Sequence, residues 1–214
     1  GRIRVTPIDD FYEFNRDSDT VDAESTVAEF VAATEQALTD GYSGLRAVID
    51  GTTVVRTPEQ LDAGARFEYL IDQQMAVLPS STLCAYSVST IGNAANELTC
   101  LHPFVAEGAV GFRLFAEPDA GFVLAGEIDA NDNEVFVTTL ERVWQLQEPG
   151  TLVIDVRDLN FITHHELYML DKLARAEQRD VLLRTDQPIV VRLTELLELT
   201  NVRLQAALPV RVPQ

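Results

Sequence analysis

The chain is poor in cysteine and tryptophan and has no long apolar run. Among its 214 residues there are 2 cysteines and 1 tryptophan. Two cysteines do not form the disulfide framework that stabilises small secreted proteins. No run of about 18 apolar residues occurs, so no membrane span is expected. No signal peptide is evident either, and we therefore expect a cytoplasmic protein.

Basic residues are also scarce. Lys and Arg number 16 against 34 Asp and Glu, and the formal net charge is −18. Nucleic-acid binders carry a basic surface, so direct nucleic-acid binding is not expected, whereas a basic protein partner is compatible with this charge. The hydrophobic fraction of 46% and the charged fraction of 23% are ordinary for a globular protein.

Hydrophobic periodicity predicts alternating strands and helices in the first half. The predicted strands are 2–8, 45–50 and 82–86, and the predicted helices are 25–38, 57–78 and 91–101. This order favours a parallel sheet with helical crossovers. Small residues at 107–111 mark a boundary. We therefore predict two α/β domains, at residues 1–106 and 109–208.

The second domain is predicted to have a mixed sheet with helices, in the order ββαβαβα. Its central stretch is Leu152–Leu170, where a buried strand ends at Val156, the chain returns to the sheet at 160–162, and Thr163 caps a helix. Residues 163–166 are therefore expected on the surface at a helix N-terminus. Such a terminus presents unpaired backbone N–H groups to a partner.

Three motifs give the second half a family resemblance. They are LAGEIDA at 124–130, LVIDVRDLNFI at 152–162 and LTELLELTNV at 193–202. At this spacing the segment resembles the STAS domain of bacterial anti-sigma factor antagonists. The resemblance implies an anti-sigma factor or a related kinase-fold regulator as partner. It implies that the partner-binding and switch residues are Asp129, Thr163, His164, His165 and Glu166.

The usual switch of that family is altered here. After the Phe-Ile dipeptide the family normally has Asp-Ser-Ser-Gly, and a partner kinase phosphorylates one serine. This chain has Thr163, His164, His165 and Glu166 at those positions, so both serines are replaced. We expect partner binding without the serine switch, with Thr163 as the remaining hydroxyl. Asp129 has an alternative role, which is to cap the helix that follows.

Four motifs of the first half carry a second resemblance. They are GYSGLRAVID at 41–50, VRTPEQLDAGARFEYLIDQQM at 55–75, LCAY at 83–86 and CLHP at 100–103. The segment resembles the C-terminal two-thirds of a MEDS domain, a predicted sensor of small hydrocarbon-derived molecules with a degenerate, partial RecA-like parallel-sheet fold. The N-terminal portion of that domain is expected to be missing here. No G-x-x-x-x-G-K-[ST] loop supports nucleotide binding.

The ligand-binding candidates in the first half are Asp50, Arg56, Cys84, Tyr86 and His102. Cys84 lies on a predicted strand, Asp50 and Tyr86 end strands, Arg56 precedes a helix and His102 follows one. Open α/β sheets bind ligands near the ends of their strands. A buried apolar cysteine, a hydrogen-bonded histidine, and an ion pair or cap are the structural alternatives.

A metal site is the weaker interpretation of these residues. Cys84, Cys100 and His102 lack CxxC or HxxxH spacing. His164 and His165 are adjacent, so they do not share a helix face as the ligands of HExxH do. We therefore expect neither a metal nor a cofactor.

The sequence favours a non-enzymatic bacterial signalling protein. Its first half would sense a small organic ligand, and its second half would bind a protein. One alternative is a degenerate nucleotide-binding or hydrolytic α/β enzyme. Another is a structural dimerisation module, which would form a homodimer.

Overall fold

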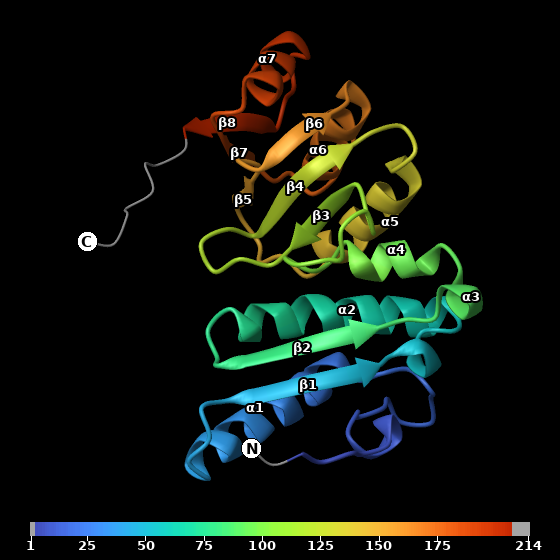
Figure 1. Cartoon of the computed structure of the whole chain (residues 1–214). Coiled ribbons are helices and arrows are strands. Elements are labelled where there is room, and N and C mark those ends of the chain that lie inside the picture. The colour runs from blue at the N-terminus through green and yellow to red at the C-terminus, as the bar shows by residue number, and fades with distance from the viewer. Residues whose placement is uncertain (1–2, 207–214) are drawn as a thin grey trace. The chain divides into compact units, whose positions relative to one another are not determined.

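The structure is a computed structural model that describes residues 3–206 (Figure 1). The chain divides into two compact units, Gly1–His102 and Pro103–Gln214, which we call the N-terminal and C-terminal units. Both units combine strands with helices, so the predicted α/β class is confirmed. The predicted boundary at 107–111 lies a few residues after the division in the structure.

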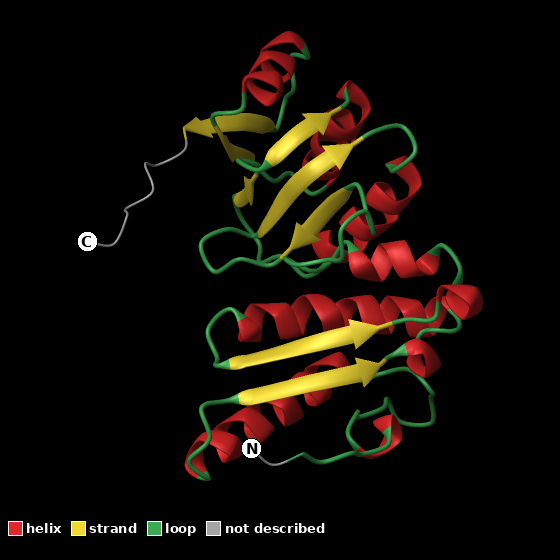
Figure 2. Ribbon diagram, in the orientation of Figure 1, coloured by secondary structure: helices red, strands yellow, loops and turns green. Residues whose placement is uncertain are grey.

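The N-terminal unit is built on a two-stranded parallel sheet. Strand β1 (Leu45–Asp50) pairs with β2 (Ser80–Ala85), and Ile49 lies opposite Cys84. Helix α1 (Ala23–Thr39) precedes β1, and α2 (Pro58–Met75) connects the two strands. Figure 2 shows both helices on the same side of the strands. The other face is open, and Val48 and Leu83 there are 80% and 64% exposed.

Local sequence signals explain where the two long helices begin. The Asp22 side chain accepts a hydrogen bond from Ser25 N at the start of α1. Helix α2 has Pro58 in its first turn and a capping box between Thr57 and Gln60. These contacts satisfy backbone N–H groups that lack partners within the helix. The helix start predicted at Thr57 is thereby confirmed.

The strand predicted at Arg2–Ile8 is wrong over its described part. Residues 3–7 have no regular structure, and Ile8–Asp10 forms the 3-10 helix η1. Ile3 and Val5 are each 92% exposed, so the alternating pattern has no buried face to stabilise a strand. The chain instead packs through an aromatic cluster, where the Tyr12 and Phe67 ring centroids lie 5.0 Å apart.

The segment after β2 is not the single helix predicted at 91–101. It forms two short helices, α3 (Val88–Ile91) and α4 (Ala94–Thr99), after the loop that follows β2. Gly92 separates them with a φ of +59°. Glycine adopts this left-handed conformation without steric cost, so the helix ends there. A further 3-10 helix, η2 (Thr52–Val54), follows β1.

The C-terminal unit has a mixed sheet, as predicted, and the sheet has six strands. Its strand order is β3-β4-β5-β7-β8, and β6 also pairs with β4. Strand β3 is antiparallel to β4, and the other pairs are parallel. The strands are β3 (Phe112–Phe115), β4 (Phe122–Ile128), β5 (Leu152–Asp155), β6 (Leu159–Ile162), β7 (Val181–Thr185) and β8 (Val202–Ala206). Strand β8 was not predicted.

Three helices accompany this sheet: α5 (Asn133–Trp144), α6 (His164–Ala176) and α7 (Pro188–Leu196). Helix α6 has an apolar face, since Leu167, Leu170 and Ala174 are buried. On α5 the large side chains of Phe136 and Trp144 are also buried. Over residues 3–206, the structure contains no helix with both the length and the apolar composition needed to cross a membrane.

Strand β4 pairs with two strands in succession, β5 and then β6, and its register shifts between Gly126 and Glu127. Before this shift, Phe122 and Val123 pair with β5, and after it, Glu127 and Ile128 pair with β6. Gly126 has a φ of +91°, and a Cβ there would lie 2.4 Å from the backbone oxygen of Gly111. Only glycine fits this close approach.

We predict that Gly126→Ala destabilises the C-terminal unit by at least about 2 kcal/mol, because backbone strain adds to a clash with the backbone at Gly111, just before β3. Gly150→Ala is the matched control: its φ is +107°, but a Cβ would meet nothing within 4 Å. Its expected cost is about 1 to 2 kcal/mol. Urea unfolding followed by the fluorescence of the buried Trp144 measures both. Equal losses in the two variants would contradict the assigned close contact.

Candidate functional site

Five polar side chains converge near the end of β2 in the N-terminal unit. Glu68 and Asp72 lie on α2, Cys84 lies in β2, Tyr86 follows that strand, and His102 follows α4. We call these residues the Glu68 cluster. Cys84, Tyr86 and His102 were predicted as ligand-binding residues, and the structure brings all three together.

Glu68 is the centre of the cluster and is only 2% exposed. Its Oε1 accepts a hydrogen bond from the Tyr86 hydroxyl. Its Oε2 accepts from the Cys84 thiol, with the sulfur 3.6 Å away, and also lies 3.6 Å from His102 Nε2. One carboxylate therefore holds three other side chains of the cluster.

His102 also faces a second acid, because its Nδ1 lies 3.4 Å from Asp72 Oδ2. These separations are ion-pair distances, and His102 Nε2 and Asp72 Oδ2 are both buried without a hydrogen-bond partner. Buried polar atoms in native proteins are usually paired, and exceptions often mark a bound water, ion or ligand.

Burial and charge set the protonation of the cluster. Burial, followed by the charge of Glu68, raises the pKa of the Cys84 thiol and the pKa of the Tyr86 hydroxyl. Burial lowers the pKa of His102, but Asp72 and Glu68 outweigh it and raise that pKa to about 9. At neutral pH the cluster therefore contains a neutral thiol and an imidazolium.

The other two predicted ligand residues are Asp50, the last residue of β1, and Arg56, in the segment before α2. Both are exposed. The Asp50 carboxylate accepts a hydrogen bond of 3.1 Å from Thr52 N, and hydrogen bonds from the side chain and the backbone of Thr52 lower the pKa of Asp50. The backbone N–H of Arg56 donates to the Gln60 side chain. These contacts are those of a turn and a helix start, and neither residue joins the Glu68 cluster.

The sequence interpretation missed Glu68 and Asp72. They are four residues apart on α2, so they share a helix face, and Glu68 lies between the buried Phe67 and Tyr69. An acid within an apolar stretch was the available signal. Cys100, the other residue weighed for a metal site, is instead buried with its thiol donating to Glu97 O.

The residues of the predicted switch lie at the carboxyl ends of β4 and β6. Ile128 pairs with Ile162 in these parallel strands, so Asp129 and Thr163 leave the sheet at the same edge. The predicted capping role of Thr163 is confirmed, because its side chain accepts from His165 N at 3.1 Å. His164 and His165 are exposed, as expected.

The expectation that Glu166 lies on the surface is wrong. Glu166 is 1% exposed because it completes the capping box of α6. Its Oε2 accepts from Thr163 N at 3.1 Å, and its Oε1 accepts from Asn133 Nδ2 at 3.0 Å. With both oxygens used inside the fold, Glu166 joins the starts of α5 and α6 and has a structural role.

Asp129 is exposed and does not cap α5. Its carboxylate accepts from Asn131 N at 2.7 Å, in a turn that precedes the helix. The helix itself begins at Asn133, with Asp132 at its N-cap position. Of the two roles considered for Asp129, the capping role is therefore excluded by the structure, and the partner-facing role stays a prediction.

Two exposed aromatic residues extend the surface around His164. Phe161 is 42% exposed and Tyr168 is 47% exposed. The rings of His164 and Tyr168 meet edge to face, with centroids 6.3 Å apart. We call Phe161, His164, His165 and Tyr168 the docking surface. Aromatic residues with a polar tip are enriched at protein interfaces.

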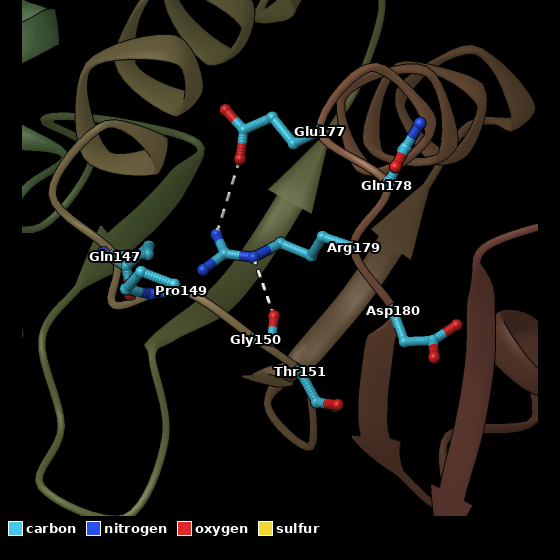
Figure 3. A pocket seen from close by; sticks show the side chains of 8 residues that line it. All are labelled: Gln147, Pro149, Gly150, Thr151, Glu177, Gln178, Arg179 and Asp180. Atoms are coloured by element: carbon cyan, nitrogen blue, oxygen red, sulfur yellow. Dashed lines mark hydrogen bonds and ion pairs between the residues drawn. The ribbon is translucent and has the colours of Figure 1, made fainter.

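A polar pocket of about 340 Å³ lies elsewhere in the C-terminal unit. It is lined by Gln147, Pro149, Gly150, Thr151, Glu177, Gln178, Arg179 and Asp180 (Figure 3). These residues precede β5 and β7, so the pocket lies at the amino ends of the strands, opposite the docking surface. Arg179 Nε donates to Gly150 O at 2.9 Å.

Comparison with known protein families gives a match that lies in the first half. The family described as MEDS, MEthanogen/methylotroph, DcmR Sensory domain, matches residues 1–103. This span contains the whole Glu68 cluster and fits a bacterial sensory or regulatory role. No curated protein and no solved structure gives a significant match to the chain. The STAS resemblance of the second half stays a prediction from its motifs.

We predict that His102 makes the N-terminal unit less stable at alkaline pH. Its folded pKa of about 9 lies above the ordinary 6.5. The contribution of the protonated ring is therefore fully present below about pH 6.5 and is lost as the pH rises through about 9. This shift corresponds to on the order of 3 kcal/mol.

Urea unfolding at several pH values in EDTA tests this, because EDTA keeps metal ions from competing for the imidazole. Circular dichroism follows the whole chain, and Trp144 fluorescence reports the C-terminal unit separately. His102→Gln is the control and should lose most of the pH dependence. Parallel loss of stability in the wild type and the variant would show that another group is responsible.

Proposed function

We propose that this chain is a non-enzymatic bacterial regulatory protein. Its N-terminal unit binds a small organic molecule, and its C-terminal unit binds a protein partner. The observation that carries the proposal is the Glu68 cluster, which lies within the span that matches a sensory domain. The unpaired atoms of His102 and Asp72 are what a ligand would satisfy.

The chemistry of the cluster supports binding over catalysis. A cysteine nucleophile works as its thiolate, whereas burial and Glu68 raise the pKa of Cys84 and keep the thiol protonated. The side chains that remain offer the Asp72 carboxylate as an acceptor and the His102 imidazolium as a donor. Such a set suits the oxygen of a small alcohol or aldehyde, in keeping with a sensor of hydrocarbon-derived molecules.

We predict that short alcohols or aldehydes raise the melting temperature of the metal-free chain. A ligand at 100 times its Kd adds about 2.7 kcal/mol of stability, which corresponds to several degrees. Thermal shift with a panel of these compounds measures the effect. Glu68→Gln should abolish the response, because it removes the charge that organises the cluster.

Asp50→Asn is the matched control, since it changes an exposed acid of the same unit outside the cluster. It should respond like the wild type. A nucleotide panel distinguishes the enzyme alternative, because specific stabilisation by a nucleotide would favour that interpretation. An equal response to organic compounds in the Glu68→Gln variant would place their binding elsewhere.

The docking surface supports the proposed binding of a protein partner by the C-terminal unit. It combines exposed aromatic and histidine side chains at the N-terminus of α6, where the helix dipole is positive. Asp129 lies nearby and adds an acidic contact. We propose that an anti-sigma factor or another kinase-fold regulator binds here. Because the usual serines are replaced, binding would not depend on serine phosphorylation.

We predict that the purified chain retains a kinase-fold regulator from the lysate of its own source organism. The double variant His164→Ala, Tyr168→Ala should reduce this retention at least 10-fold, since it removes the central aromatic pair. Arg192→Ala, an exposed change on α7, is the matched control. Mass spectrometry identifies and quantifies the captured protein. Retention that is unchanged in the double variant, or capture of unrelated proteins only, would contradict the proposal.

A further inference from the structure

We infer that Glu68, Cys84 and His102 form a binding site for one zinc-like divalent metal ion. Each residue offers one ligand atom, and these three atoms all lie within 4.8 Å of one another. The inference deepens the proposed function and rests on it, because it names a ligand for the same cluster. Its test is nevertheless independent of any organic molecule.

The spacing of the ligand atoms suits a tetrahedral ion. Zinc bonds of about 2.0–2.3 Å place neighbouring ligand atoms about 3.3–3.8 Å apart. Glu68 Oε2 lies 3.6 Å from Cys84 Sγ and 3.6 Å from His102 Nε2. Two of the three separations therefore already match the coordination geometry, with no movement of the helix or the strand.

The surrounding contacts leave Glu68 Oε2 and His102 Nε2 as the atoms available to an ion. Tyr86 donates to Glu68 Oε1, which leaves Oε2 for the ion. Asp72 lies 3.4 Å from His102 Nδ1, and a carboxylate at that nitrogen leaves Nε2 as the metal-binding atom. His102 Nε2 is the buried atom that lacks a hydrogen-bond partner. A metal ion would satisfy it.

The donor set and the charge favour zinc. A thiolate, an imidazole and a carboxylate are the three side-chain ligand types of zinc sites, whereas magnesium and calcium prefer oxygen alone. Two acids, Glu68 and Asp72, face one histidine. A divalent cation there would replace the two positive charges that leave with the protons of the thiol and the imidazolium. As it binds, the Cys84 thiol and the His102 imidazolium each release one proton to solvent.

Three protein ligands leave a fourth coordination position. Such sites hold water or a small ligand there, in contrast to the four protein ligands of structural zinc. His102 keeps 19% of its side chain exposed, so the site is not sealed from solvent. The open position gives a small molecule with an oxygen or sulfur donor a direct contact with the ion.

Metal analysis and cobalt substitution of the full chain test this inference. After EDTA treatment and removal of the chelator, the chain should bind one zinc ion. Cobalt should give the visible bands of a tetrahedral site and a thiolate-to-cobalt charge-transfer band. Cys84→Ser should remove the charge-transfer band. Cys84→Ser and His102→Gln should each weaken zinc binding more than about 100-fold, as measured against a competing chelator.

Asp72→Asn tests the positioning of His102 without removing a ligand. It should lower zinc affinity about 10- to 100-fold, the usual effect of changing a hydrogen-bonding partner of a metal ligand. Cys100→Ser is the control for cysteine, and His164→Ala with His165→Ala is the control for histidine. Both controls should bind zinc like the wild type. Circular dichroism of each metal-free variant confirms that it is folded.

The wild-type spectrum decides the question even if a variant fails to fold. A chain that binds no zinc, or cobalt without a thiolate band, would overturn the inference. Loss of zinc in the histidine control would do the same, because it would place the ion in the C-terminal unit. Organic compounds that stabilise the EDTA-treated chain would still support the proposed function. Zinc binding without any response to organic compounds would support the metal site alone.

Discussion

The N-terminal unit depends on one buried carboxylate. Glu68 is almost fully enclosed, yet burying a carboxylate is costly unless other groups hydrogen-bond or pair with it. Helix α2 supplies the acid. Strand β2, the residue after it and the segment after α4 supply the groups that hydrogen-bond or pair with it. These elements are far apart in the sequence. The same contacts that make the acid tolerable therefore also hold Cys84, Tyr86 and His102 at one point.

The two units use one principle to place their polar residues. In both, parallel strands end at a common edge, and the residues that follow them come together there. Cys84 and Tyr86 lie near the end of β2, while Asp129 and Thr163 follow β4 and β6. Open α/β sheets bind their ligands at this edge. The difference lies in burial, since the first group is enclosed around Glu68 and the second remains exposed.

Periodicity and capping signals predicted most elements, because these signals are local. Thr57 and Thr163 marked helix starts correctly, since a cap acts within one turn. The strand expected at 2–8 failed because a strand also needs a neighbour and a buried face. Glu166 was misplaced for a related reason: its partner Asn133 is 33 residues away. Glu68 and Asp72 were missed because their partners, too, come from distant segments.

Buried polar groups that have hydrogen-bond partners within the fold are structural, whereas those that lack partners mark the candidate site. Arg179 is buried, but its guanidinium donates to carbonyls at Gly150 and Glu148, so the nearby pocket gains no free donor from it. Glu166 likewise uses both oxygens. In the described part of the C-terminal unit, the unpaired buried side-chain atoms belong to Trp144 and Gln205, which lie on different elements.

The contrast with the N-terminal unit is one of chemistry and position. There the two atoms without a hydrogen-bond partner belong to an imidazole and a carboxylate, Asp72 Oδ2 lies 3.4 Å from His102 Nδ1, and a thiol and a second carboxylate stand beside them. The two acids stabilise the protonated imidazole, yet they leave these two buried atoms without hydrogen bonds. Their arrangement is understandable if a bound species, absent from the chain itself, completes the contacts. Function is therefore best sought at Glu68, where the protein's own atoms do not suffice.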